Sequence, residues 1–364
     1  MQGITDLSSE TAYCAPTLFC DRTALLELKG SHMASIRLLY GLLALSLVAC
    51  GGGGEDQPTP EGPHYAFVAN KLSVPTNNNQ AREYGLDLNN DKTVDNQLGM
   101  VLGTLAGQGF DVQGTIDKAI AEASIILLAD FQSASFDSTS AAGLQIKLGD
   151  METPAACAAG EEFLCKLANG TECKSADTGC TCAGCGKHLT GSGVFTIDAN
   201  SPDNAAVAGK VVGGTFTGGP GDITLKIALG SAAGIELDLI GARAKATGIT
   251  EAGMTSVVIA GALTKEDLDG KVIPAIHMQI SPIVTEDCPT PGAADCGCMA
   301  GSTGKTILNL FDTMPKDCKV DVAEISNNTL IQSLLAPDVK INGKDALSLG
   351  IKAVTVKGSF PTGP

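Results

Sequence analysis

Apolar and polar residues alternate in several short segments after residue 64, and this two-residue period predicts antiparallel strands with one buried face. The clearest case is 235–239, where Ile235, Leu237 and Leu239 alternate with two acidic residues. Two segments of turn-forming composition, 218–222 and 231–234, predict turns between such runs. On this basis we expect strands at 125–131, 144–148, 194–197, 207–216, 223–229, 235–239, 339–341 and 347–356.

A helical period appears in two neighbouring segments, 98–105 and 116–123, which Gly107 and Gly109 separate. Further along, Thr264 and Asp267 form a capping pair before a helical pattern, and an apolar stripe at 330–335 stops before Pro337. Together the elements predict an α+β fold dominated by an antiparallel sheet or sandwich, with short helices covering one face. We expect one globular domain, 64–364, with Cys-rich loops at 152–188 and 286–304.

The net charge and the aromatic content of the chain argue against some classes of binding partner. The chain carries 24 Lys and Arg against 40 Asp and Glu, a net charge of −16. Binding to nucleic acid requires cationic side chains that displace counterions, so we expect no nucleic-acid partner. Trp is absent, and the 10 Phe and 4 Tyr leave few flat faces on which sugars or bases could stack.

The segment that starts at Met33 has the architecture of a secretory signal peptide: Arg37, an apolar run, then small residues before Cys50. The run is too short to span a bilayer, which requires about 20 residues. Leu47-Val48-Ala49-Cys50 resembles the lipobox of bacterial lipoproteins. The resemblance implies cleavage after residue 49, acylation of Cys50 and a membrane as partner through that anchor, which places the protein in the cell envelope, at the outer membrane or cell surface rather than the inner membrane.

The segments on either side of the signal peptide carry no fold information. Residues 50–63 combine glycines, prolines and acids, so they predict a flexible tether between anchor and domain. Residues 1–32 precede a signal that must be terminal to be recognised, and we exclude them as a doubtful upstream extension. Gly30-Ser31-His32-Met33 leaves two explanations open, an overextended gene start and a cloning scar.

An exported protein lies in an oxidising compartment, where clustered cysteines usually form disulfides. Cys14 and Cys20 fall in the doubtful extension, which leaves an even number of candidates besides Cys50. A thiolate zinc or iron–sulfur site at 180–185 and 296–298, or a redox role for Cys182 and Cys185, is the less favoured alternative. The candidates for disulfides are Cys157, Cys165, Cys173, Cys180, Cys182, Cys185, Cys288, Cys296, Cys298 and Cys318.

The strongest chemical motif is a loop rich in short oxygen-bearing side chains. Asp87, Asn89, Asp91 and Asp95 occupy loop positions one, three, five and nine, and the carbonyl of Thr93 is available at position seven. Calcium requires six to eight oxygen ligands, and alternate residues of a tight loop can supply them. The loop resembles those of EF-hands, dockerins and thrombospondin type 3 repeats, and it predicts one Ca²⁺ site. A solvated Asn/Asp-rich turn is the alternative.

Two positions depart from those loops. Lys92 stands where a turn glycine is usual, and Leu98 stands at position twelve, where an acid is usual. We therefore expect modest affinity unless Asp95 or a distant residue completes the shell. A weaker similarity at 317–324 lacks the first ligands, and we interpret it as a helix start whose early acids complement the helix dipole.

Enzyme signatures are scarce, and we expect no catalytic residue. Residues 300–306 imitate the end of a P-loop but lack its first glycine, so we expect a turn and a helix start there. His188 is expected to be an ordinary loop residue, and His277 to be packed within a helix. No zinc-binding H-E-x-x-H array or nucleophile elbow is present.

The whole arrangement resembles lipoproteins that large-genome Gram-negative bacteria carry in many copies. The matching features are the lipobox, the tether, Val94-Asp95-Asn96-Gln97-Leu98-Gly99 and a Gly-rich β domain with cysteine insertions. The resemblance implies a location and an architecture but no activity. We expect a binding or structural module with an unknown protein or small-molecule ligand. A hydrolase with an acidic site and a carrier of lipids or small apolar ligands are the alternatives.

Overall fold

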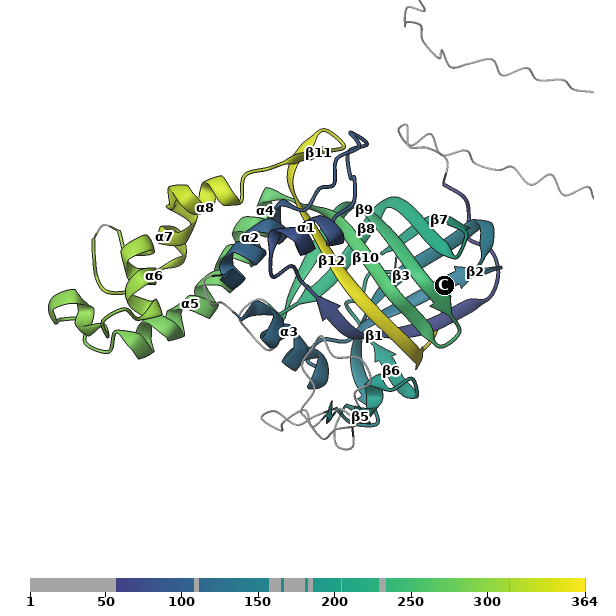
Figure 1. The fold of residues 1–364 in the computed structure, drawn as a ribbon, viewed down its shortest axis with the longest axis horizontal. Coiled ribbons are helices and arrows are strands. Elements are labelled where there is room, and N and C mark those ends of the chain that lie inside the picture. Colours follow the sequence, from purple (N-terminus) through teal and green to yellow (C-terminus); the bar gives the residue numbers. More distant parts are fainter. Residues whose placement is uncertain are drawn as a thin grey trace, which may run out of the picture. The chain divides into compact units, whose positions relative to one another are not determined.

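Eight of the described strands form a closed antiparallel barrel in the computed structural model (Figure 1). The structure describes residues 57–107, 111–156, 165–166, 181–182, 186–203, 205–228, 234–313 and 315–363. Each barrel strand pairs with the next one along the chain, and the last pairs back with the first. The strands are β1 (His64–Ser73), β2 (Leu127–Ser133), β3 (Ser138–Thr153), β7 (Ala206–Val212), β8 (Thr215–Ile227), β9 (Ile235–Thr250), β10 (Gly253–Leu263) and β12 (Lys344–Ser359).

The expected β-dominated α+β fold with an antiparallel sheet is confirmed, and the closed barrel is a more specific description than the expected sheet or sandwich. The pairing of β1 with β12 removes both free edges, which an open sheet would expose to other chains. Several strands contain register shifts, for example between Gly218 and Gly221 in β8 and between Met254 and Val257 in β10. Such irregularities bend strands and increase their twist, which a closed barrel requires.

Apolar side chains fill the inside of the barrel. The inward positions alternate along each strand, as at Leu127, Ala129 and Phe131 of β2. Phe131 packs edge-on against Phe216 of β8, with ring centroids 5.3 Å apart. An eight-stranded barrel has an interior that is just wide enough for side chains to fill. The inside of the barrel is therefore a packed core.

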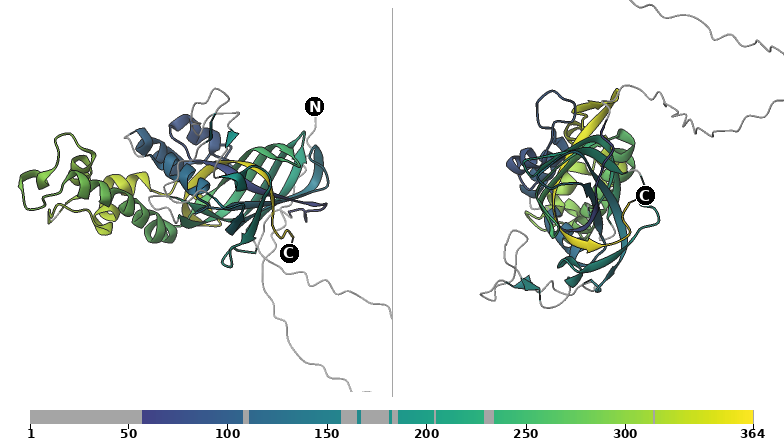
Figure 2. Two further views of the ribbon diagram at one scale, coloured as in Figure 1. Left: turned by 90° about the horizontal axis from the view of Figure 1, so that it is seen from below. Right: turned by 90° about the vertical axis from the view of Figure 1, so that its right-hand side faces the viewer.

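Helices gather at the end of the barrel where β1 and β10 finish (Figures 1 and 2). One group, α1 (Asn78–Tyr84), α2 (Gln97–Gly107) and α3 (Val112–Ala121), connects β1 to β2. The connection from β10 to β12 contains α4 (Lys265–Asp267), the π-helical turn η2 (Leu268–Val272), α5 (Ile273–Asp287), η3 (Ala294–Gly297), α6 (Thr303–Phe311), α7 (Val322–Asn327), α8 (Thr329–Leu334) and β11 (Val339–Ile341). The helices thus cap one end of a barrel and do not cover one face of a sheet.

A smaller layer lies outside the barrel wall. It comprises β4 (Cys165–Lys166), β5 (Thr181–Cys182), η1 (Lys187–Leu189) and β6 (Gly193–Ile197). β6 pairs with β3 and β12, and its Phe195 packs with Val68 and Leu128 on the outer face. This contact explains why β1 and β2 are apolar on both faces.

The last residues of the expected tether lie along the barrel. Ser133 donates its N–H to the carbonyl of Pro63, Glu61 donates to Ala141, and Gln57 bonds to the carbonyl of Pro220. The chain from Gly54 to Pro364 forms one compact unit. Cys50 and the expected signal peptide lie outside the described residues. Among the helices that the structure describes, none combines the length and apolar character needed to cross a bilayer.

Most of the elements expected from the sequence are present. Two kinds of error occur: one expected turn lies inside a strand, and two strands were not expected. The segment 218–222 is wrong as a turn, because β8 continues through it and the turn between β7 and β8 is Gly213-Gly214, both with positive φ. The strands β1 and β10 were missed because both of their faces are buried, so their sequences do not alternate. The helix expected from Thr264 onward is confirmed, and Thr264 caps it by accepting the N–H of Asp267.

Candidate metal-binding loop

The oxygen-rich loop, residues 87–95, connects α1 to α2 and packs against the outside of the barrel. An isolated bridge pairs Leu86 with Asp95 and closes the loop at its base. Leu86 and Leu88 pack in an apolar cluster with Val339 and Ile341 of β11. The apolar residues between the oxygen-bearing ones therefore fix the position of the loop, while the residues near its tip face solvent.

The first three candidate ligands fold back into the loop. The Asp87 carboxylate accepts the backbone N–H groups of Asp91 and Lys92, at 3.2 and 2.9 Å. Asn89 accepts the N–H of Asp91 at 3.0 Å, and Asp91 accepts that of Thr93 at 2.7 Å. These bonds hold the side-chain oxygens on the concave side of a tight turn, which is the arrangement that oxygen-ligated cation loops use.

Asp95 differs from the other candidates because it is buried, with 7% of its surface exposed. Its carboxylate accepts the N–H of Leu88 at 2.7 Å. Burial raises the pKa of Asp95, and the negative charges of Asp91, Asp338 and Asp87 raise it further. By contrast, the N–H of Thr93 lowers the pKa of the exposed Asp91. The base of the loop thus contains a buried carboxylate among other negative groups.

The candidate ligands do not converge to a closed cation shell. The carboxylates of this loop do not all lie within 4.8 Å of one another. Within the described part of the chain, the ligand atoms that do so belong to Cys296, Asp312 and Cys318. Thr93 is exposed, and its side chain also hydrogen-bonds to Asp91. A cation would therefore have to draw the carboxylates of Asp87, Asp91 and Asp95 closer together.

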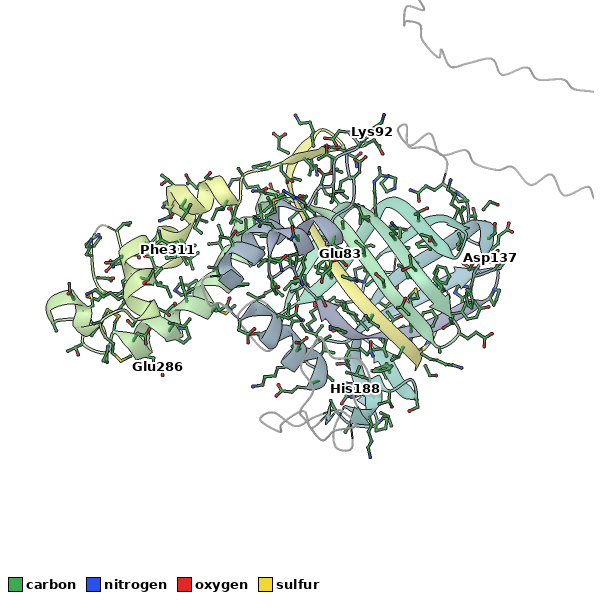
Figure 3. All side chains as sticks on the ribbon, in the orientation of Figure 1. Glu83, Lys92, Asp137, His188, Glu286 and Phe311 are labelled. Atoms are coloured by element: carbon green, nitrogen blue, oxygen red, sulfur yellow. A yellow bond between two sulfur atoms is a disulfide. The ribbon has the colours of Figure 1, made fainter. Side chains whose placement is uncertain are left out.

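The structure shows the effect of the two positions, Lys92 and Leu98, at which the loop differs from EF-hand loops. Lys92 has a φ of 71° and Asn90 a φ of 65°, so both adopt the left-handed conformation that favours glycine or asparagine. Figure 3 shows Lys92 at the exposed tip of the loop. Leu98 at position twelve is buried in the main core and offers no oxygen.

Three further residues, none of which was expected as a ligand, lie at the loop. Asn96 begins α2 by accepting the N–H of Gly99 and also bonds to β12 through Gly350. Arg243 of β9 donates to Asn90 at 2.8 Å. Asp338 lies close enough to raise the pKa of Asp95 and accepts the N–H of Ser348. Asn96 could have been found as a capping residue, but no local signal links Arg243 or Asp338 to the loop.

Four of the described cysteines form two disulfides in the connection between β10 and β12. Cys288 bonds to Cys298, and Cys296 bonds to Cys318. The thiolate site that combined 180–185 with 296–298 is therefore not favoured, because both of its downstream cysteines are bridged to other residues. Cys165 and Cys182 face each other in the backbone pairing of β4 and β5. Cys157, Cys173, Cys180 and Cys185 lie outside the described residues.

The other candidate segments and histidines of the sequence have structural roles, and only His188 differs from what was expected. Ser302 caps α6 where the P-loop-like segment begins, and Asp321 and Glu324 form a capping box at α7, as expected. His277 is half-buried and bonds to the carbonyl of Val320. His188, expected to be an ordinary loop residue, is fully buried, and burial lowers its pKa. It lies near β6 in Figure 3, and its ring packs against Phe195.

No protein-family model matches the chain, and comparison with curated proteins and with solved structures gives no match either.

Proposed function

We propose that the protein is an exported, lipid-anchored barrel whose acidic loop binds calcium and thereby stabilises the junction of the loop with the barrel. The calcium proposal depends on one observation, the burial of the Asp95 carboxylate among other negative groups. The pKa of this carboxyl group is raised for that reason. Buried charges are usually paired with an opposite charge or bound to a metal. None of the ion pairs among the described residues includes Asp95, and a calcium ion at this place would compensate its charge.

The position of the loop supports a structural role for the ion. Asp95 lies next to Asn96, which joins α2 to β12, and Leu86 and Leu88 join the loop to β11. A cation that orders residues 87–95 would therefore stabilise the contacts among α1, α2 and the last strand. Ligand binding to the folded state alone raises stability by about 2.7 kcal/mol when the free ligand is at 100 times its Kd.

Calorimetry and thermal unfolding of the full chain test this function. After metal removal by a chelator, added Ca²⁺ should release or absorb heat at one site per chain and raise the melting temperature. A variant with alanine at Asp87, Asn89, Asp91 and Asp95 should show neither effect. The control changes Asp198 and Asn200 to alanine, because they form a similar hydrogen-bonded turn elsewhere. An unchanged melting temperature and heat signal in the wild-type chain would rule out the calcium proposal.

The anchor is tested separately. Labelled palmitate should be incorporated into the wild-type protein, and Cys50→Ser should move the protein from the membrane fraction to the soluble fraction. Retention of that variant in the membrane would argue against acylation at Cys50 and would leave the calcium proposal standing.

The carrier alternative finds less support. Phe67, Phe131 and Phe216 are fully buried among the residues that fill the core of the barrel, where a carrier would hold its ligand. The hydrolase alternative has no described group of catalytic side chains in its favour, so we propose no enzymatic activity.

A further inference from the structure

A second site lies in the helical connection between β10 and β12, separate from the acidic loop. Asp312 follows the last residue of α6, and its carboxylate is buried, with 6% of the residue exposed. One of its oxygens and the sulfur atoms of Cys296 and Cys318 all lie within 4.8 Å of one another. A carboxylate and two sulfurs thus meet at one point, where the loop between α6 and α7 that holds Asp312 and Cys318 meets η3, which holds Cys296.

The charge of Asp312 has no described counterpart. Its oxygens accept the backbone N–H groups of Asp317 and Cys318, at 3.1 and 3.0 Å. Among the ion pairs of the described residues, none includes Asp312. Burial of an ionised carboxylate is unfavourable unless a positive charge or a metal compensates it. The two N–H groups orient the carboxylate.

The sulfur atoms have no affinity for a metal while they are bonded to each other, but as thiolates they would be strong ligands. We propose that reduction of the Cys296–Cys318 disulfide creates a zinc site formed by the two thiolates and the carboxylate of Asp312. Zn²⁺ takes four ligands from sulfur, nitrogen and oxygen, so water would fill the fourth position. The Cα atoms of the two cysteines are 5.5 Å apart, so the thiolates would start close together.

The surrounding structure would keep the three ligands together after reduction. In the oxidised chain the Cys288–Cys298 disulfide also holds the segment of Cys296 against the end of α5, but after reduction the ligands would be kept together by hydrogen bonds. The hydrogen bond from the N–H of Cys318 to Asp312 holds the other cysteine beside the carboxylate. Asp287 further joins this segment to α6, since its carbonyl accepts the N–H of Met299 and its carboxylate that of Gly304.

The redox step balances with a dithiol as the electron donor. One thiolate of the donor attacks a sulfur of the Cys296–Cys318 bridge and forms a mixed disulfide, which the second thiol of the donor resolves. The donor leaves as a disulfide, having given up two electrons and two protons, and Cys296 and Cys318 become thiols. Zn²⁺ then displaces both thiol protons. The oxidised chain and the reduced chain would thus differ in their ability to bind zinc.

Cobalt is the probe for the test, because Co²⁺ bound to thiolates absorbs light. The full chain is reduced with a dithiol, freed of it by gel filtration without oxygen, and titrated with Co²⁺; Zn²⁺ should then displace the cobalt. The oxidised chain should give no thiolate-to-cobalt band. Cys296→Ser combined with Cys318→Ser should bind one equivalent fewer than the reduced wild-type chain, while Cys288→Ser combined with Cys298→Ser should retain that equivalent.

The cysteines in 157–185 are common to all these variants, so their contribution cancels in the comparison. Asp312→Asn keeps the size of the side chain and both disulfides, and it should weaken binding at this site by at least about tenfold and shift the visible cobalt spectrum. Circular dichroism of each variant establishes that it is folded. Equal cobalt binding by the wild-type chain and the Cys296/Cys318 variant, or no effect of Asp312→Asn, would overturn the proposal.

Discussion

Asn96 shows how one side chain can join distant parts of the chain. Its amide donates to the carbonyls of Ala81 and Gly350, and its oxygen accepts the N–H groups of Gly99 and Gly350. The pairing of β1 with β12 ends at Ser73 and Lys352. Asn96 therefore satisfies the next backbone groups of β12, where β1 is no longer present.

We predict that Asn96→Ala destabilises the protein by about 2–4 kcal/mol, because it leaves buried backbone groups of Gly350 without partners and removes the cap of α2. Chemical denaturation of the variant and the wild type measures the difference. Asn77→Ala is the matched control, since the side chain of Asn77 caps α1 by accepting the N–H groups of Asn79 and Gln80, and its loss should cost about 1 kcal/mol. Equal losses for the two variants would contradict the bridging role of Asn96.

The raised pKa of Asp95 leads to a prediction about pH. A carboxyl group whose pKa is higher in the folded state than in the unfolded state stabilises the fold at low pH, and this contribution is lost as the pH rises through the folded-state value. Without calcium, Asp95→Asn should therefore melt at a higher temperature than the wild type at neutral pH. The difference should shrink as the pH falls and vanish below about pH 3, where Asp95 is protonated in both states.

Thermal unfolding at several pH values, with a chelator present, measures this difference. Addition of calcium should reverse the order of the two proteins at neutral pH, since only the wild type would bind the ion. A variant that is less stable than the wild type at neutral pH without calcium would show that the charge of Asp95 is already compensated.

At the scale of elements, the loop between α1 and α2 has a ligand pattern that favours calcium binding, but one of its residues has an unfavourable backbone conformation. Lys92 adopts the left-handed conformation, and it stands at the loop position where EF-hands have glycine. This conformation costs about 1–2 kcal/mol for a residue other than glycine, and the greater freedom of glycine in the unfolded chain offsets about half of that.

We predict that Lys92→Gly stabilises the protein by up to about 1 kcal/mol and tightens calcium binding. Lys92→Ala removes the same positive charge without relieving the backbone, so it separates the two effects. Denaturation midpoints and calcium titrations of both variants give the answer. If the alanine variant gains as much stability as the glycine variant, the charge of Lys92 and not its conformation is responsible.

The elements that alternate or have a helical period could be predicted from the sequence, and the reason is local. β9 begins with Ile235, Leu237 and Leu239 facing one side, and the stripe of α3 at Ile116, Ala119 and Ile120 is buried as expected. β10 could not be recognised, because Ala260 and Ala262 pack outward against Leu88 and β11 while Ile259 faces the core. Both faces of this strand are buried by partners far away in the sequence.

At the scale of the whole molecule, closure of the barrel depends on contacts that no local pattern contains. β1 and β12 pair from Phe67 with Lys357 to Ser73 with Lys352, across almost the full length of the domain. For the same reason the pairing of Cys296 with Cys318 and the approach of Asp312 to both could not be deduced from spacing. The loop ligands could be proposed from sequence because they are neighbours along the chain.

Phe131 tests whether the inside of the barrel acts as one packed core. The side chain is fully buried and contacts Phe216 across the barrel. We predict that Phe131→Ala lowers the free energy of unfolding by about 3–5 kcal/mol, while Phe131→Leu costs less than about 1.5 kcal/mol. Urea denaturation provides the measurement. A loss below about 1 kcal/mol for the alanine variant would indicate a loosely packed interior instead.

The contacts of Asp130 have a consequence for how the domain can be connected to other chains. Its carboxylate bonds to the Nδ1 atom of His64 at 2.9 Å and accepts the N–H of Gly363 at 2.9 Å. Entry and exit of the barrel domain therefore lie side by side. A short linker could fuse them and new ends could be opened at the hairpin around Glu251, giving a circular permutant, and the domain could equally be inserted into a loop of a host protein.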